Sequence, residues 1–166
     1  MEVIVGTCDG TGAAINVILG KHPIKVKVMN MEDAGTLYPV LDWNNQMALI
    51  SAVDEGIKHT GTTDADRAAV AANGISLYNG GDDIVYDGAT NMRWEDSDGN
   101  SVEEKYVDGY YQRAAGGDAA YKCYGDKTVP GGLTDGAKVK TAPGFTIGTD
   151  ADINVDGEQL IWEAWV

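Results

Sequence analysis

The sequence predicts a mainly β protein: a single domain over residues 1–166, of the β-sandwich or jelly-roll-like type, with one short helix near residues 64–73. Three observations support this class. Twenty-two glycines are spread along the chain, and glycine marks the turns between many short elements. Residues Ile24–Val28 alternate strictly between apolar side chains and lysines, as a half-buried strand does. No repeat or linker divides the 166 residues, a length that suits one domain.

Short strands are predicted along the first part of the chain. The candidates are Glu2–Val5 and Ala13–Leu19, on either side of a glycine-rich turn, followed by Ile24–Val28. Pro39 restricts the extended segment Leu37–Trp43 to a sheet edge or an irregular path, because proline cannot donate to a β-ladder. Met47–Val53 is continuously apolar, which fits either a strand buried on both faces or a helix fragment.

The one predicted helix spans Asp64–Asn73. Alanines fill its interior, and Thr63 or Asp64 can accept hydrogen bonds from the first backbone N–H groups. Gly74 suits the left-handed conformation that ends many helices. Because the segment is short, contacts with the rest of the fold must stabilise it.

After this segment, short strands are again predicted between turns. The candidates are Ile75–Tyr78, Ile84–Tyr86, a strand within Val102–Tyr111, Phe145–Ile147, Asp152–Val155 and Gln159–Trp165. Residues 95–136 are polar and rich in glycine and tyrosine, and long segments of this kind are often functional. Asp156-Gly157 is a strong tight-turn signal, which predicts a hairpin between the last two strands.

The same C-terminal residues also match the spacing of an EF-hand calcium loop. Asp152, Asn154 and Asp156 stand at ligand positions one, three and five, with Gly157 at position six and Glu163 at position twelve. An EF-hand needs a helix on each side of its loop. The residues before Asp152 contain proline and glycine, and only three residues follow Glu163, so we expect the hairpin and no metal site. A row of carboxylates on one strand face could still bind a surface cation.

Composition limits the possible partners. The net charge of -14 argues against nucleic acid and against anionic membranes, both of which require basic surfaces. Cys8 and Cys123 lie far apart and without a metal-binding pattern, which favours free thiols, although a disulfide stays open. Neither a signal peptide nor an apolar run of membrane-spanning length is found, so we expect a soluble protein made in a cytosol.

The residues give little support for catalysis. His22 and His59 have no nucleophile or metal partner at a recognisable spacing, so we expect no catalytic residue, no cofactor and no enzymatic activity. Tyrosines concentrate within the long polar stretch, at Tyr106, Tyr110, Tyr111, Tyr121 and Tyr124. Tyrosine beside glycine suits a protein interface or sugar stacking, and it also suits the rim of a core.

Motifs near the two ends of the chain resemble a group of small β-rich virion proteins of tailed bacteriophages. The similar residues are Gly10–Ala14, Ile15–Gly20, Ile24–Asn30, Gly144–Gly148, Asn154–Glu158 and Trp162–Trp165. Residues 31–142 carry no such similarity.

The resemblance implies a β-sandwich or jelly-roll-like module that is made in the host cytoplasm and carried on the virion. It implies a capsid decoration, or cement, protein that binds the major capsid protein and stabilises the head by bridging capsid subunits. A homo-oligomer is expected, with a trimer favoured. The alternative is a tail-fibre or adhesin-type module that binds host surface glycans, which the tyrosine-rich stretch favours. Short length and the lack of a repetitive shaft favour decoration.

Overall fold

The computed structural model describes residues 1–32, 38–61, 63–81, 83–86, 91–95, 101–107, 110–113, 120–124 and 138–166. Between residues 82 and 139 only the backbone of the strands is described. Strands make up most of the regular structure, and the mainly β prediction is confirmed. In the part of the chain that is described, no helix is long and apolar enough to cross a membrane.

The elements are short, as the glycine content indicates. The strands of the first half are β1 (Val3–Asp9), β2 (Ile15–Ile18), β3 (Lys25–Asn30), β4 (Val40–Asn44), β5 (Gly56–His59), β6 (Arg67–Val70) and β7 (Ile75–Tyr78). Those of the second half are β8 (Asp83–Tyr86), β9 (Asn91–Glu95), β10 (Ser101–Val107), β11 (Tyr110–Arg113), β12 (Ala120–Tyr124), β13 (Lys138–Lys140), β14 (Gly144–Ile147) and β15 (Gln159–Trp165). Two 3-10 turns accompany them, η1 (Met47–Leu49) and η2 (Asp64–Asp66).

The chain forms two compact units, and each contains segments that are distant in sequence. Unit 1 consists of Met1–Ala14, Pro23–Ser76 and Thr146–Val166, and unit 2 consists of Ile15–His22 and Leu77–Phe145. The single domain over residues 1–166 stays a prediction.

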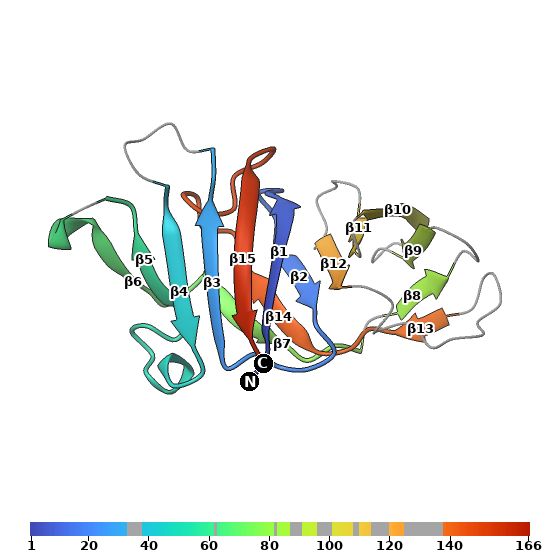
Figure 1. The fold of residues 1–166 in the computed structure, drawn as a ribbon, viewed down its shortest axis with the longest axis horizontal. Helices are drawn as coiled ribbons and strands as arrows, with labels where there is room; N and C mark the ends of the chain where they lie inside the picture. Colours follow the sequence, from blue (N-terminus) through green and yellow to red (C-terminus); the bar gives the residue numbers. More distant parts are fainter. Residues whose placement is uncertain are drawn as a thin grey trace. The chain divides into compact units, whose positions relative to one another are not determined.

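The sheet of unit 1 has the strand order β1-β15-β3-β4-β5-β6, and every neighbouring pair is antiparallel (Figure 1). The last strand, β15, lies between β1 and β3. Alternate side chains of β1, β15, β3 and β4 are buried and form one core face: Ile4, Cys8, Val26, Val28, Leu41, Trp43, Leu160, Trp162 and Ala164. Full burial of a large apolar side chain is worth about 1.5–3 kcal/mol. The segment Ile24–Val28, which the alternation predicts to be a half-buried strand, overlaps β3, where Val26 and Val28 are buried.

The other face of this sheet carries cross-strand charges. The register places Glu163 of β15 opposite Lys27 of β3, and Lys27 opposite Asp42 of β4. Opposite charges at directly paired positions favour this register over one shifted by a residue.

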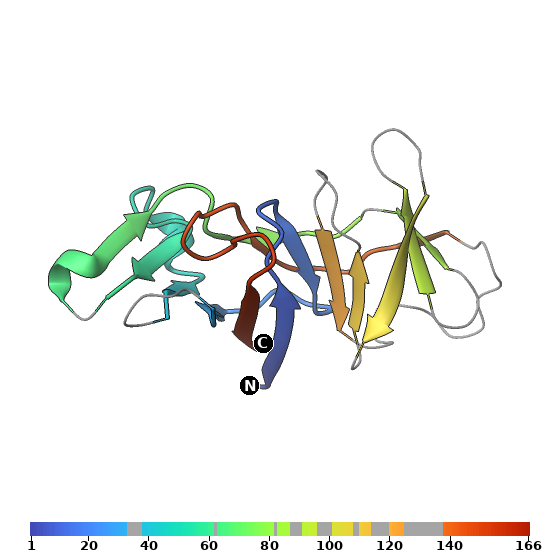
Figure 2. The same cartoon turned by 90° about the horizontal axis from the view of Figure 1, so that it is seen from above.

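Most strands of unit 2 form a ladder in the order β13-β8-β9-β10-β11-β12-β2, and β14 and β7 complete the order of this sheet (Figures 1 and 2). The boundary between the units falls within β7 and β14. Neighbouring strands of this ladder are antiparallel, except that β12 and β2 run parallel.

The helix predicted over residues 64–73 is wrong. Only Asp64–Asp66 forms a 3-10 turn, and the following residues form β6, which pairs with β5 from His59↔Arg67 to Gly56↔Val70. The capping signal has a different use, because the Asp66 carboxylate accepts hydrogen bonds from the N–H and hydroxyl of Thr63. A short alanine-rich segment has little helical stability of its own, and the β5 ladder satisfies its backbone instead.

Three other local predictions also need correction. Residues 152–155 do not form a strand, so the C-terminal hairpin is wrong, and β15 pairs with β1 and β3. Pro39 does not force an edge position, because it precedes β4, which lies between β3 and β5. Met47–Val53 is not a strand buried on both faces; of the helix fragment, the alternative, only the 3-10 turn η1 forms, and no residue of η1 is buried.

Candidate functional site

The segment between β14 and β15, residues 148–158, is named the C-terminal loop, and its centre is a buried asparagine. Asn154 is 2% exposed. Its Oδ1 accepts a hydrogen bond from Thr11 N at 2.9 Å, and its Nδ2 donates to Ala13 O at 2.6 Å and to Gly148 O at 2.8 Å. The amide therefore joins the N-terminal turn to the start of the loop, and its oxygen already has a protein donor.

A glycine allows the N-terminal turn to approach the loop closely. Gly10 N donates to Glu158 O at 2.7 Å, and Gly157 N donates to Gly10 O at 3.0 Å. A Cβ at Gly10 would lie 2.0 Å from the backbone oxygen of Val155, a distance that no side chain tolerates. Only glycine fits where these two backbone segments meet.

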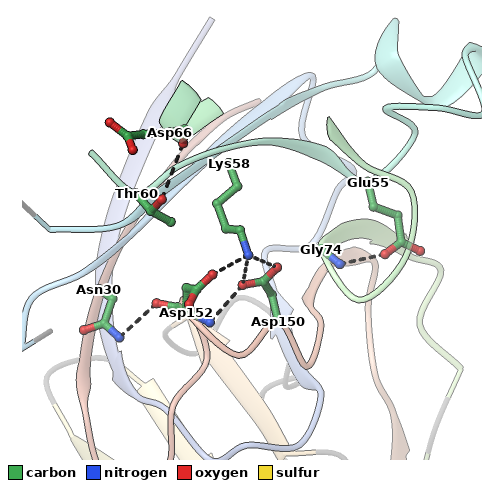
Figure 3. Close-up of polar contacts among 8 residues, drawn as sticks. All are labelled: Asn30, Glu55, Lys58, Thr60, Asp66, Gly74, Asp150 and Asp152. Atoms are coloured by element: carbon green, nitrogen blue, oxygen red, sulfur yellow. Dashed lines mark hydrogen bonds and ion pairs between the residues drawn. The ribbon is translucent and has the colours of Figure 1, made fainter. Parts of the chain in front are cut away.

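The end of β3 supports the same loop from the other side. Asn30 is fully buried, and its Nδ2 donates to Ile153 O at 3.2 Å and to the carboxylate of Glu158. A longer contact of 3.4 Å reaches Asp152 O (Figure 3). Residues far apart in sequence thus satisfy the polar groups of the C-terminal loop.

A lysine from β5 holds two carboxylates of the loop (Figure 3). Lys58 Nζ lies 3.0 and 2.9 Å from the two carboxylate oxygens of Asp150, and 2.6 Å from Asp152 Oδ2. The Asp150 side chain is 11% exposed and that of Asp152 is 49% exposed. Burial by itself lowers the pKa of Lys58, but hydrogen bonds to Asp152 and Asp150 and their charges outweigh burial and raise the pKa above 10.5.

Three side chains that would bind calcium in an EF-hand loop are held elsewhere in this structure. Asp152 is paired with Lys58, Asn154 is buried, and Glu163 lies on a strand that begins at Gln159. The strand face that would carry a row of carboxylates does not form. Among the described residues, no group of three or more His, Cys, Asp or Glu side chains could hold a metal ion.

The second candidate region is the end of the unit 1 sheet where β1 and β3 begin and β4 ends. We name it the apolar end. Backbone hydrogen bonds join its segments: Glu2 N to Val166 O, Ile24 N to Trp165 O, and Asn45 N to Ile24 O. In Figure 1 the two termini and the loop after β4 all lie at this end. Large apolar side chains are exposed there: Met1, Val3, Ile24, Leu49 and Ile50.

The turn of the apolar end that carries Leu49 and Ile50 is well ordered by hydrogen bonds. Leu49 is 78% exposed and Ile50 is 56% exposed. Asn44 Oδ1 accepts from Gln46 N at 3.0 Å and from Met47 N at 3.3 Å, which starts the turn. Leu49 N donates to Gln46 O and Ile50 N to Met47 O, and η1 results. The turn is therefore fixed although it buries none of its own residues.

The structure divides the predicted tyrosine cluster. The register places Tyr106 opposite Tyr111, and Tyr110 opposite Tyr124. Tyr121 stands opposite Asn16 of β2. Because successive strand positions alternate between faces, the first two pairs occupy opposite faces of the unit 2 sheet, and the five positions do not form one patch. Their side chains lie outside the described part of the chain.

The other predicted residues are not brought together. His22 Nε2 lies 3.2 Å from Tyr78 O in unit 2, and His59 lies on β5 opposite Val40. Cys8 is buried, and the Cys123 side chain lies outside the described part of the chain. Sequence reasoning missed the Lys58 contact and the apolar end. The turn signal Asn44-Asn45 before the apolar run is the clue that could have indicated an exposed loop.

Comparison of the chain with protein-family models, with curated protein sequences and with solved structures found no match.

Proposed function

We propose that this chain is a structural protein of a tailed-phage particle, of the capsid decoration type. It binds the major capsid protein and stabilises the head by bridging capsid subunits, without enzymatic activity. The observation that carries the proposal is the convergence of the motifs that resemble phage virion proteins. Most of them meet around the C-terminal loop in unit 1.

Four of the six motifs contribute to the same network, and Gly148 of Gly144–Gly148 is one of its acceptors. Gly10–Ala14 supplies the backbone that Asn154 binds, and Asn154–Glu158 supplies the loop itself. Ile24–Asn30 ends at the asparagine that binds Glu158. Trp162 is fully buried and pairs with Gly6 and Val28. Unrelated turns and strands that resemble a family by chance have no reason to form one network. The resemblance therefore concerns a packed substructure, which supports the transfer of a virion role.

A loop held by hydrogen bonds from several parts of the chain suits a protein that must withstand force on a particle. A decoration protein adds interface that resists the outward pressure of packaged DNA, and a standard interface buries about 800 Å² on each partner. We also propose that the protein assembles as a homo-oligomer, with a trimer favoured. Sedimentation of the purified protein measures this order directly.

Deletion of the gene tests the role. Particles without the protein should lose infectivity faster on heating or osmotic shock while they still adsorb to cells. Adding the purified protein back should restore stability. Imaging of intact particles should place the chain on the head. Normal stability combined with lost adsorption would contradict decoration and favour the alternative.

The second candidate is a tail-fibre or adhesin-type module that binds host surface glycans. The specific observation in its favour is two cross-strand tyrosine pairs on opposite faces of the unit 2 sheet, Tyr106↔Tyr111 and Tyr110↔Tyr124, since aromatic rings provide stacking surfaces for sugars. A glycan array with the purified protein tests it. Binding that Tyr111→Ala or Tyr124→Ala abolishes would favour this role.

A further inference from the structure

We propose that Asn79 is a site of spontaneous deamidation, in which the backbone nitrogen of Gly80 attacks the side-chain amide of Asn79. The fold protects the identical dipeptide Asn73-Gly74 from the same reaction. This inference concerns the covalent chemistry of the protein itself and does not depend on the proposed function. It is carried by the sequence motif, by the hydrogen bonding of each glycine N–H and by exposure.

The chemistry needs only an asparagine, the next backbone nitrogen and water. The nitrogen gives up its proton and bonds to the asparagine Cγ, and the bond from Cγ to the amide nitrogen breaks, so that ammonia leaves. Water then opens the cyclic imide at either carbonyl and leaves aspartate or isoaspartate. Glycine in the second position favours the attack, because it has no side chain beside the nitrogen and its backbone turns easily. The reaction therefore requires no oxidant and no cofactor.

The glycine N–H groups distinguish the candidate sites. Four Asn-Gly or Asp-Gly dipeptides lie in the described part of the chain, and in three of them the glycine N–H has an acceptor. These acceptors are Glu158 O for Gly10 N at 2.7 Å, Gly10 O for Gly157 N at 3.0 Å, and Glu55 Oε2 for Gly74 N at 2.7 Å. Gly80 is the exception, since its N–H has no acceptor among the described residues. Its nitrogen can attack without first losing a hydrogen bond.

The other asparagine-glycine pair, Asn73-Gly74, is held on several sides within unit 1. The nitrogen of Gly74 donates to the carboxylate of Glu55 (Figure 3), and loss of its proton beside an anion is disfavoured. Gly148 N donates to Gly74 O at 2.6 Å, and Asp150 N donates to Asn73 O at 2.9 Å. The two peptide units therefore cannot turn toward the geometry of attack without breaking these bonds.

The pair Asn79-Gly80, in unit 2, is open to water but fixed in sequence. Asn79 is exposed and directly follows β7. Gly80 has a φ of 74°, and a Cβ there would lie 2.5 Å from Thr141 O, so only glycine fits. The fold thus keeps the reactive residue in second position and leaves the asparagine before it exposed.

Incubation of the full-length protein in mildly alkaline buffer provides the test. Peptide mass spectrometry measures aspartate and isoaspartate at both positions of the same molecule. Asn79 should convert at least about tenfold faster than Asn73, because the attack at Asn73 first loses a hydrogen bond to a charged acceptor. In urea the two rates should become similar, since both asparagines are then followed by a free glycine. Asn79→Gln is the control and should lose the conversion at this position while Asn73 keeps its wild-type rate.

Two variants of Glu55 test the protection directly. Glu55→Ala removes the acceptor of Gly74 N and should raise the rate at Asn73 about tenfold. Glu55→Gln keeps an acceptor oxygen without the charge and should raise it less. Thermal unfolding of both variants shows whether the fold is kept, and the wild-type comparison of the two asparagines stands without them.

Each result decides the inference. Equal rates at the two asparagines of the folded protein, or faster conversion at Asn73, would overturn it. A protein that converts in urea and at neither position when folded would show that Asn79 is protected as well. A difference that persists unchanged in urea would assign it to the neighbouring residues in the sequence and refute protection by the fold.

Discussion

The two ends of the unit 1 sheet solve opposite problems. At the C-terminal loop, buried Asn30 and Asn154 use their amides to satisfy backbone groups, and Lys58 pairs with two carboxylates. At the apolar end, hydrogen bonds fix a turn that exposes Leu49 and Ile50. At the first end, polar side chains form hydrogen bonds that hold the loop. At the second end, the backbone forms its own hydrogen bonds, and apolar side chains are exposed. Substitutions at the first should therefore act on stability, and those at the exposed side chains of the second should leave it nearly unchanged.

Asn154→Ala should give the largest loss of stability. It leaves Thr11 N and Gly148 O without the partner they have in the folded protein, and it leaves Ala13 O with the Thr11 hydroxyl alone. Each buried polar group left unsatisfied costs about 1–3 kcal/mol, so we expect a loss of about 3–5 kcal/mol, reduced where water enters. Urea unfolding measures it. Asn45→Ala, at an exposed asparagine of the apolar end, is the control and should change stability by less than about 0.5 kcal/mol. Equal losses in the two variants would break the comparison.

Lys58→Met should come next. The substitution keeps the aliphatic stem but leaves Asp150, at 11% exposure, without its cation. Removal of one partner of a fully buried pair costs about 3–5 kcal/mol and of an exposed pair about 1 kcal/mol or less, so an intermediate loss of about 1–3 kcal/mol is expected. Lys27→Met, which removes a half-buried cation opposite Glu163 and Asp42, is the comparison and should lose less, about 1 kcal/mol or less. Wild-type stability of Lys58→Met would show that the loop does not need this contact.

The pH dependence of stability gives an independent measure of the same contact. The pKa of Lys58 is raised above 10.5 in the folded protein, so folding is favoured by the protonated amine. The contribution is fully present below about pH 10.5 and is lost as the pH rises through the folded pKa. Wild-type stability should therefore fall toward that of Lys58→Met at alkaline pH. A constant difference between the two proteins across this range would contradict the assignment.

The elements that follow from local pattern were predictable from the sequence. The alternation in Ile24–Val28 identifies β3, and the apolar alternation in Gln159–Trp165 identifies β15. The helix at 64–73 and the hairpin at 152–165 were wrong because distant residues decide both segments. β6 is a strand because it pairs with β5, and nothing local in Asp64–Asn73 encodes that pairing.

The candidate sites show the same limit. The spacing from Asp152 to Glu163 matches an EF-hand loop, but the residues around it predicted a hairpin, and turns occupy most of residues 151–157 instead. The partners of its side chains are separated by 92 residues for Lys58 and Asp150 and by 143 for Thr11 and Asn154. Sequence spacing carries no record of such contacts. The apolar end was missed for the reverse reason: an apolar run such as Met47–Val53 is normally buried, and only the fold shows that it is exposed.

Leu49→Asp should have the smallest effect on stability, and that small effect sharpens the comparison most. Leu49 is 78% exposed on a turn that buries none of its residues, so the free energy of unfolding should change by less than about 0.5 kcal/mol. Binding of a hydrophobic dye should fall, because the substitution removes exposed apolar surface. Leu41→Asp, at a fully buried position of β4, is the contrasting control and should unfold the protein. A large loss of stability in Leu49→Asp would mean that the turn is covered in the free protein. Unchanged stability with reduced dye binding would confirm that the turn exposes Leu49 in the free protein.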